Sequence, residues 1–136
     1  MADDAAPPGF REAPDQGPFL EQAGPLLMRE RDGETVYGIR AEERHANSGG
    51  AVMGGMLATF ADHALARAIE ADADDDHRRA TVSLTVDYLA PAEPGDWIES
   101  RASVDRVGGA LAFADCSLTV EGREVVRARA VFARVD

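Results

Sequence analysis

Residues 44–71, RHANSGGAVMGGMLATFADHALARAIEA, decide the fold of this chain. Four glycines lie between positions 49 and 55, and glycine at that density lets the backbone turn sharply or approach another group closely. Apolar residues then recur at helical spacing and predict one long helix from about Gly54 to Ala71. The stripe expected to face the core contains Met53, Met56, Leu57, Phe60, Ala64 and Ala68.

Strand patterns flank this helix on both sides. Upstream, Asp32-Gly33 is a strong turn dipeptide between two apolar segments, and downstream Gly108-Gly109 and Glu121-Gly122 are hairpin signals. The predicted strands cover residues 26–30, 35–39, 81–88, 97–107, 111–120 and 124–135. The sequence therefore predicts an α+β fold in which an antiparallel sheet of about six strands wraps around one long central helix.

Length and charge bound the class of protein. The 136 residues fit one domain, with residues 1–17 expected as a flexible, proline-broken N-terminal arm and residues 18–136 as the folded domain. A net charge of -11 argues against nucleic acid and anionic membranes as partners. No apolar run is long enough to span a membrane and the start is acidic, so we expect a cytoplasmic protein.

Neither metal nor disulfide chemistry is expected. The three histidines, His45, His63 and His77, are not spaced as a metal site. His45 precedes the glycine-rich segment and is expected to be structural, with orientation of that loop as the alternative. The lone Cys116 lies inside a predicted strand and is expected to be a core residue.

Asp62 is the candidate for chemistry on the predicted helix. On a helical wheel it lies opposite the core stripe, among the uncharged Ala58, Leu65, Ala66 and Ile69. A carboxylate in partly dry surroundings becomes a better base or nucleophile. The alternative is an ordinary surface aspartate on an alanine-rich helix, and spacing alone favours that alternative.

The glycine pairs and Asn47 add a second candidate feature. Gly54-Gly55 lies at the predicted helix start, where free N–H groups and the positive end of the helix dipole favour an oxyanion. Thioester hydrolysis needs such a donor, a base or nucleophile, and a polar group that orients the carbonyl, roles that Gly54, Asp62 and Asn47 can supply. A glycine-rich helix start with Asn47 as a cap or turn residue remains the alternative.

Three segments resemble one family. The pattern Asn47-x-x-Gly50-x-x-Met53-Gly54-Gly55 followed by Asp62 resembles the PaaI-type acyl-CoA thioesterases of hotdog fold. The segments TVSLTVDYLAPA at 81–92 and RVGGALAF at 106–113 are also similar to that family, and the likeness runs from Phe19 to Val135.

The resemblance implies a homodimer, with a dimer of dimers as the larger alternative, and two active sites at the subunit interface. Asp62 would be nucleophile or general base, the Gly54 N–H would polarise the thioester carbonyl, Asn47 would place carbonyl or water, and Thr81 would lie near that water. No separate cofactor is implied, since coenzyme A is part of the substrate. The implied substrate-binding residues are Met53, Gly55, Tyr88, Leu89, Ala90, Pro91, Arg106, Gly108 and Gly109.

Two positions depart from the family pattern. Met53 stands where the family usually has His, and Gly109 stands where Lys or Arg is frequent. The leading hypothesis is an acyl-CoA thioesterase that releases free acid and coenzyme A. The alternative is a hotdog module that binds acyl-CoA or a related ligand without turnover; a hydratase-type hotdog enzyme would need a different local motif.

The acidic chain must still meet the phosphates of coenzyme A. A local cluster is expected among Arg101, Arg106, Arg127 and Arg129, although structural roles are the simpler interpretation for the last two.

Overall fold

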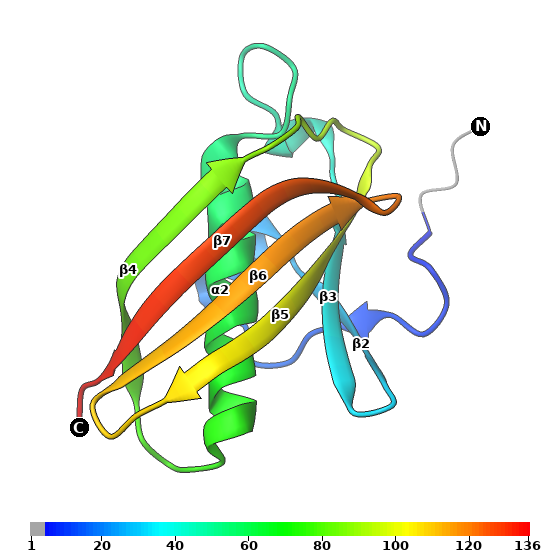
Figure 1. Ribbon diagram of the computed structural model, residues 1–136. Coiled ribbons are helices and arrows are strands. Elements are labelled where there is room, and N and C mark those ends of the chain that lie inside the picture. The colour runs from blue at the N-terminus through cyan, green and yellow to red at the C-terminus, as the bar shows by residue number, and fades with distance from the viewer. Residues whose placement is uncertain (1–4) are drawn as a thin grey trace.

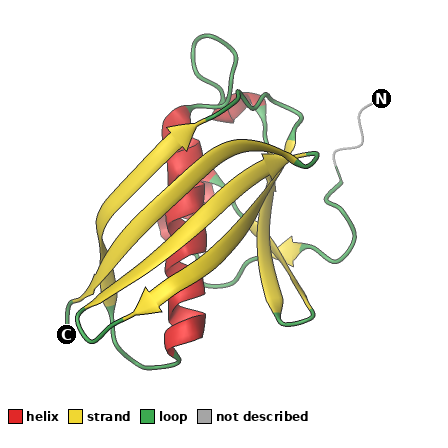
Figure 2. Cartoon of the chain, in the orientation of Figure 1, coloured by secondary structure: helices red, strands yellow, loops and turns green. Residues whose placement is uncertain are grey.

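One long helix and a curved antiparallel sheet make up the fold, as the sequence predicts. The computed structural model describes residues 5–136, and its sheet has the strand order β1-β2-β3-β5-β6-β7-β4. Figure 1 shows the sheet curving around helix α2, with β4 at one edge, and Figure 2 shows the same arrangement by element type. The elements are β1 (Arg11–Glu12), α1 (Gly17–Ala23), β2 (Leu27–Arg31), β3 (Glu34–Arg40), a 3-10 turn (Glu43–His45), α2 (Gly54–Ala73), β4 (Arg79–Tyr88), β5 (Trp97–Val107), β6 (Leu111–Val120) and β7 (Arg123–Arg134).

The three predicted hairpins, β2–β3, β5–β6 and β6–β7, form at the turns that the sequence predicts. Asp32 and Gly33 both have positive φ, as do Glu121 and Gly122, which is the backbone that two-residue turns between twisted antiparallel strands require. β5 and β6 have the bounds predicted from the sequence. The strand count is higher by one, because the short β1 also pairs with β2.

Helix α2 buries a wider face than the predicted stripe. Leu57, Phe60 and Ala64 are buried as expected, but Met53 is 55% exposed and lies outside the core. Leu65 and Ile69, placed beside Asp62 on the helical wheel, are completely buried. The sheet wraps the helix from β5 round to β4, so more than one flank of the helix is covered.

Small side chains let the sheet approach the helix closely. Ala112 and Ala114 of β6 and Ala128 and Ala130 of β7 are buried on the helix-facing side. Cys116 shares that face and is buried, which confirms its predicted place in the core. Close packing of this kind keeps α2 in one position relative to the strands.

The N-terminal segment differs from the expected arm. Residues 1–4 lie outside the described part of the chain, but Arg11–Glu12 pairs with β2, and Ala13 and Gln16 are buried. The Gln16 side chain bonds to Ala13 and to both backbone groups of Leu26. These contacts attach residues 11–16 to the body of the protein before α1 begins.

No helix among residues 5–136 is long and apolar enough to cross a membrane.

Candidate active site

A β-bulge brings Thr81 to the helix-facing side of β4. Strict alternation would put Thr81 on the same face as Ser83, but the pairing with β7 shifts register between these two residues, with Val82 as the extra residue. Thr81 is therefore opposite the buried Phe132, while Ser83 is opposite Val131. The bulge turns the Thr81 hydroxyl toward α2.

The bulge makes Thr81 a partner of Asp62. The Thr81 hydroxyl donates a hydrogen bond of 2.8 Å to Oδ1 of the half-buried Asp62. Asp62 forms no ion pair with any basic side chain among residues 5–136. The carboxylate is thus held by a neutral donor at one oxygen, which leaves the other oxygen available to a water or a substrate.

The start of α2 carries free backbone donors. Within the described chain, no acceptor takes the N–H of Gly54 or Gly55, and no side chain caps the helix at Met53. The Tyr88 hydroxyl donates a 2.7 Å hydrogen bond to the Gly54 carbonyl. A Cβ on Gly54 would lie 3.2 Å from the Tyr88 ring, so glycine is what permits this close approach.

One chain holds the donors and the carboxylate apart. Gly54 and Asp62 are eight residues apart on the same helix, which separates them by about 12 Å along its axis at 1.5 Å per residue. A reacting carbonyl has to lie about 3 Å from both the oxyanion donor and the attacking group. Gly54 and Asp62 of a single chain therefore cannot act on the same thioester.

Asn47 closes its own loop. Its side-chain oxygen accepts the N–H of Gly49 at 2.9 Å, and its backbone groups bond to Ala51 and Gly50. The side chain is exposed, and no described contact joins it to Asp62 or Thr81. Asn47 thus makes the turn contacts that the alternative interpretation predicted. Within one chain its side chain is not joined to Asp62 or Thr81, so a role toward substrate would require a site that a second subunit completes.

The two predicted substrate-binding segments lie at opposite ends of the sheet. At one end of β4, Tyr88 is the cross-strand neighbour of Val126 in β7. At the other end, Arg79 is the cross-strand neighbour of Arg134, which lies beside the turn that contains Gly108 and Gly109. The ten residues of β4 span about 30 Å at the rise of a strand. Residues 88–91 and 106–109 of one chain cannot line the same short groove.

The expected arginine cluster does not form within the chain. Arg101 is paired with Glu34, Arg127 with Glu124, and Arg129 with both Asp105 and Asp115. Arg106 alone of the four expected arginines has no carboxylate partner among residues 5–136. The candidate cluster is therefore reduced to Arg106, and the structural roles expected for Arg127 and Arg129 are present: Arg127 bonds to Glu124 on its own strand, and Arg129 bonds to its cross-strand partner Asp115.

A cleft among the described residues lies away from the predicted site. About 720 Å³ in volume, it lies between the β2–β3 hairpin, β5 and the C-terminal half of α2, and none of the predicted site residues lines it. Three of its charged lining residues form ion pairs, Arg67 with Glu70 and Glu34 with Arg101 outside the lining. Of the predicted site residues, Thr81 and Tyr88 lie on the edge strand β4.

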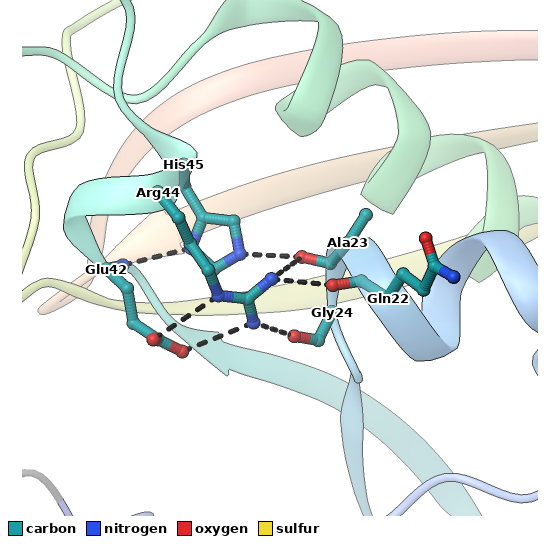
Figure 3. Close-up of polar contacts among 6 residues, drawn as sticks. All are labelled: Gln22, Ala23, Gly24, Glu42, Arg44 and His45. Atoms are coloured by element: carbon teal, nitrogen blue, oxygen red, sulfur yellow. Dashed lines mark hydrogen bonds and ion pairs between the residues drawn. The ribbon is translucent and has the colours of Figure 1, made fainter.

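Two residues that precede Asn47 make more contacts than the sequence indicates. Arg44 and the buried His45 bond to the last carbonyls of α1, as Figure 3 shows. The pattern that points to them is a basic pair just before the glycine-rich segment. Their partners could not be foreseen, because α1 is twenty residues away in sequence.

No group of three or more His, Cys, Asp or Glu side chains in the described residues could hold a metal ion.

Comparison with known proteins decides the family. The model of the thioesterase superfamily matches residues 49–127, which include the start of α2, Asp62 and Thr81. The chain belongs to the thioesterase superfamily. A relative from Pseudomonas aeruginosa, named "Putative esterase PA0474", is 35% identical over 127 residues, covering 93% of this chain and 95% of the relative.

Further similar proteins give a consistent result. Human acyl-coenzyme A thioesterase 13 is 29% identical over 93 residues, which are 68% of this chain and 66% of the human protein. The phenylacetic acid degradation protein PaaI from Thermus thermophilus, solved as a single-residue mutant, is 26% identical with a TM-score of 0.77, covering 88% of this chain and 100% of that one. The predicted PaaI-type resemblance and the hotdog fold are confirmed.

Proposed function

We propose that this thioesterase-superfamily protein hydrolyses an acyl-CoA thioester to the free carboxylic acid and coenzyme A. The observation that carries the proposal is the 2.8 Å hydrogen bond from Thr81 to an Asp62 carboxylate that has no cationic partner in the described chain. Human acyl-coenzyme A thioesterase 13 is a relative, which supports an acyl-CoA substrate. A Bacillus halodurans protein with the same fold, at 19% identity and a TM-score of 0.82, was solved with CoA.

In the proposed mechanism, Asp62 acts as general base. Thr81 holds one carboxylate oxygen, and the other oxygen accepts a proton from a water as that water attacks the thioester carbonyl carbon. The N–H of Gly54, and that of Gly55 beside it, stabilise the negative charge on the carbonyl oxygen. The tetrahedral intermediate then breaks its carbon–sulfur bond, and the proton passes from Asp62 to the leaving thiolate. In the nucleophilic variant, the free Asp62 oxygen attacks the carbonyl carbon and the carbon–sulfur bond breaks, which leaves an acyl–Asp62 anhydride and releases the thiolate; water then hydrolyses the anhydride to the free acid and Asp62, and the proton that this step releases passes to the thiolate.

We propose a homodimer as the working unit, because one chain separates the donors from the carboxylate. β4 is an edge strand in which Val82 and Tyr88 are each more than half exposed, and Leu89, directly after the strand, is half exposed. Such a surface is suited to pairing with a second copy. Antiparallel pairing of two β4 strands would set the helix start of one subunit near Asp62 of the other. It would likewise bring residues 88–91 of one copy toward residues 106–109 of the other.

A dimer of dimers is the larger assembly proposed from the resemblance. The outer face of the sheet carries the exposed ion pairs of Arg127 and Arg129, so it offers little apolar surface there. We therefore expect any second interface to avoid this charged part of the sheet. Light scattering coupled to size-exclusion chromatography distinguishes two subunits from four.

The test of the proposed function is removal of the base. Asp62→Asn keeps the size of the side chain and its bond to Thr81, but it cannot accept a proton from water. With a panel of acyl-CoA substrates and a thiol reagent, the variant should lose release of free thiol at least a hundredfold, whereas its dimer and melting temperature should persist. Full activity of Asp62→Asn refutes the assignment.

One observation favours the second candidate, a binding module without turnover. Met53, which stands where the family usually has a histidine, presents no hydrogen-bonding group and is half exposed at the helix start. Calorimetric titration of the wild-type protein with the same acyl-CoA panel separates the two functions. Binding without thiol release above background supports the module, and turnover rejects it.

A further inference from the structure

Arg44 and His45 join α1 to the segment that leads into α2. The Arg44 guanidinium donates to the carbonyls of Gln22, at 2.6 Å, and of Gly24, and it also pairs with Glu42 (Figure 3). These are the terminal carbonyls of α1, which has no basic residue in its own last turn. A cation there satisfies free acceptors and the negative end of the helix dipole.

The His45 ring is bonded at both nitrogens. Nδ1 accepts the backbone N–H of Glu42 at 2.9 Å, and Nε2 lies 2.6 Å from the Ala23 carbonyl oxygen. Because a carbonyl can only accept, Nε2 carries the proton and the ring is neutral. The side chain is buried, so the ring has no alternative partner in water.

The far end of this connection is the start of α2. The His45 carbonyl accepts the N–H of Met53 at 2.8 Å, and the Met53 carbonyl in turn accepts the N–H of Met56 in the first turn of the helix. Gly54, which bears the free donor, directly follows Met53. Residues 47–50, in the loop between His45 and Met53, are exposed. The direction of the helix start is therefore set by the bonded residues His45 and Met53 and not by this exposed part of the loop.

We propose that Arg44 and His45, bonded to the carbonyls of residues 22–24, form a brace that positions the oxyanion donors of α2. His45 is a positioning residue in this proposal and does not touch the substrate. The inference rests on the proposed function, since it assigns a catalytic purpose to the direction of the Gly54 and Gly55 N–H groups. Misplacing such donors by about 1 Å is enough to cost a large factor in rate.

The decisive variant is His45→Phe, which keeps a buried ring but removes both of its hydrogen bonds. We expect kcat for thioester hydrolysis to fall between about tenfold and a hundredfold with KM within about twofold, because the donors act in the transition state. In ¹H–¹⁵N spectra, the Gly54 and Gly55 amide resonances should shift. Arg44→Lys, at an exposed position, keeps the charge but loses the forked geometry and should lower kcat in the same direction.

Ile69→Ala is the matched control for lost stability. Ile69 is fully buried in the same helix, about 22 Å from Gly54 along its axis, so this variant should lower the melting temperature without moving kcat or the two amides. The brace is refuted if His45→Phe keeps wild-type kcat while Asp62→Asn is inactive, or if the Gly54 and Gly55 resonances do not move. If Asp62→Asn stays active, the proposed function fails instead, and the amide resonances still decide the brace.

Discussion

Two inactive variants of this protein should restore each other's activity when they share a dimer. The first is Asp62→Asn, which removes the proposed base. The second is Gly54→Pro, which removes the first of the two proposed oxyanion donors, the N–H at the first position of α2. Proline is favoured at the first position of a helix because the backbone N–H that it lacks has no helical partner there. The preceding residue, Met53, has φ -60° and ψ 133°, an extended conformation that a residue before proline adopts without strain. The proline ring displaces Tyr88 slightly, since the site of its Cβ lies 3.2 Å from that side chain.

The expected recovery follows from the distance between the two groups. About 12 Å along α2 separates Gly54 from Asp62 in one chain, so each site of the proposed dimer combines Gly54 of one subunit with Asp62 of the other. In a mixed dimer, one site then has both wild-type groups and the other site has neither. Random pairing of equal amounts makes about half of the dimers mixed, each with one intact site of two, which predicts about a quarter of wild-type activity.

The assay uses the two variants with different affinity tags, unfolded together and refolded, then purified over both tags. Thiol release per dimer is compared with wild type and with each variant refolded alone. Purified mixed dimers should reach about half of wild-type activity, because every one holds a single intact site. Mixed dimers as inactive as their parents would refute the shared site, and activity in either parent alone would refute the role of the substituted group.

Four further outcomes test Thr81, Cys116 and Gly38. Thr81→Val should lower kcat about tenfold through loss of the hydrogen bond to Asp62, with Thr81→Ser retaining it, as measured by thiol release. Burial raises the pKa of Cys116 to about 12, so its thiol should react slowly with Ellman's reagent at pH 8 and rapidly in guanidinium. The pKa of this thiol is higher in the folded protein than its value of about 8.5 in the unfolded chain. Above pH 8.5 the unfolded chain therefore loses this proton more readily than the folded protein, and the free energy of unfolding should decline as the pH rises further. Gly38→Ala should lower the free energy of unfolding in guanidinium titrations by about 1–3 kcal/mol, because the new methyl group would overlap the Trp97 ring; an unchanged midpoint contradicts this packing.

The fold was predictable because its signals are local. Asp32-Gly33 and Glu121-Gly122 need only their own backbone preference to make the two turns with positive φ. The helix required only the periodicity of residues 54–71, and its last two residues were missed because α2 continues to an αL cap at Asp74. Helix and hairpins together left few ways to bury the apolar faces other than a sheet curved around α2.

The site was only partly predictable because it depends on contacts between distant segments. Asp62 and Thr81 were both named, but regular alternation placed Thr81 on the wrong face of its strand. A single extra residue, Val82, reverses that face, and nothing in the period of the sequence marks a bulge. The family resemblance indicated a role for Thr81, and the bulge is the physical reason that this hydroxyl reaches the helix.

The charge of the chain bears on how coenzyme A could be held. A net charge of -11 repels a phosphate-rich ligand at long range, and local attraction requires a guanidinium that is not already neutralised. Among the four arginines expected to help, pairing with carboxylates leaves Arg106. Arg106 lies at the opposite end of the sheet from Tyr88, so within one chain it is remote from the helix start. In the proposed dimer, the subunit that supplies Asp62 would also supply its unpaired Arg106, and we expect this guanidinium to meet the phosphates of coenzyme A.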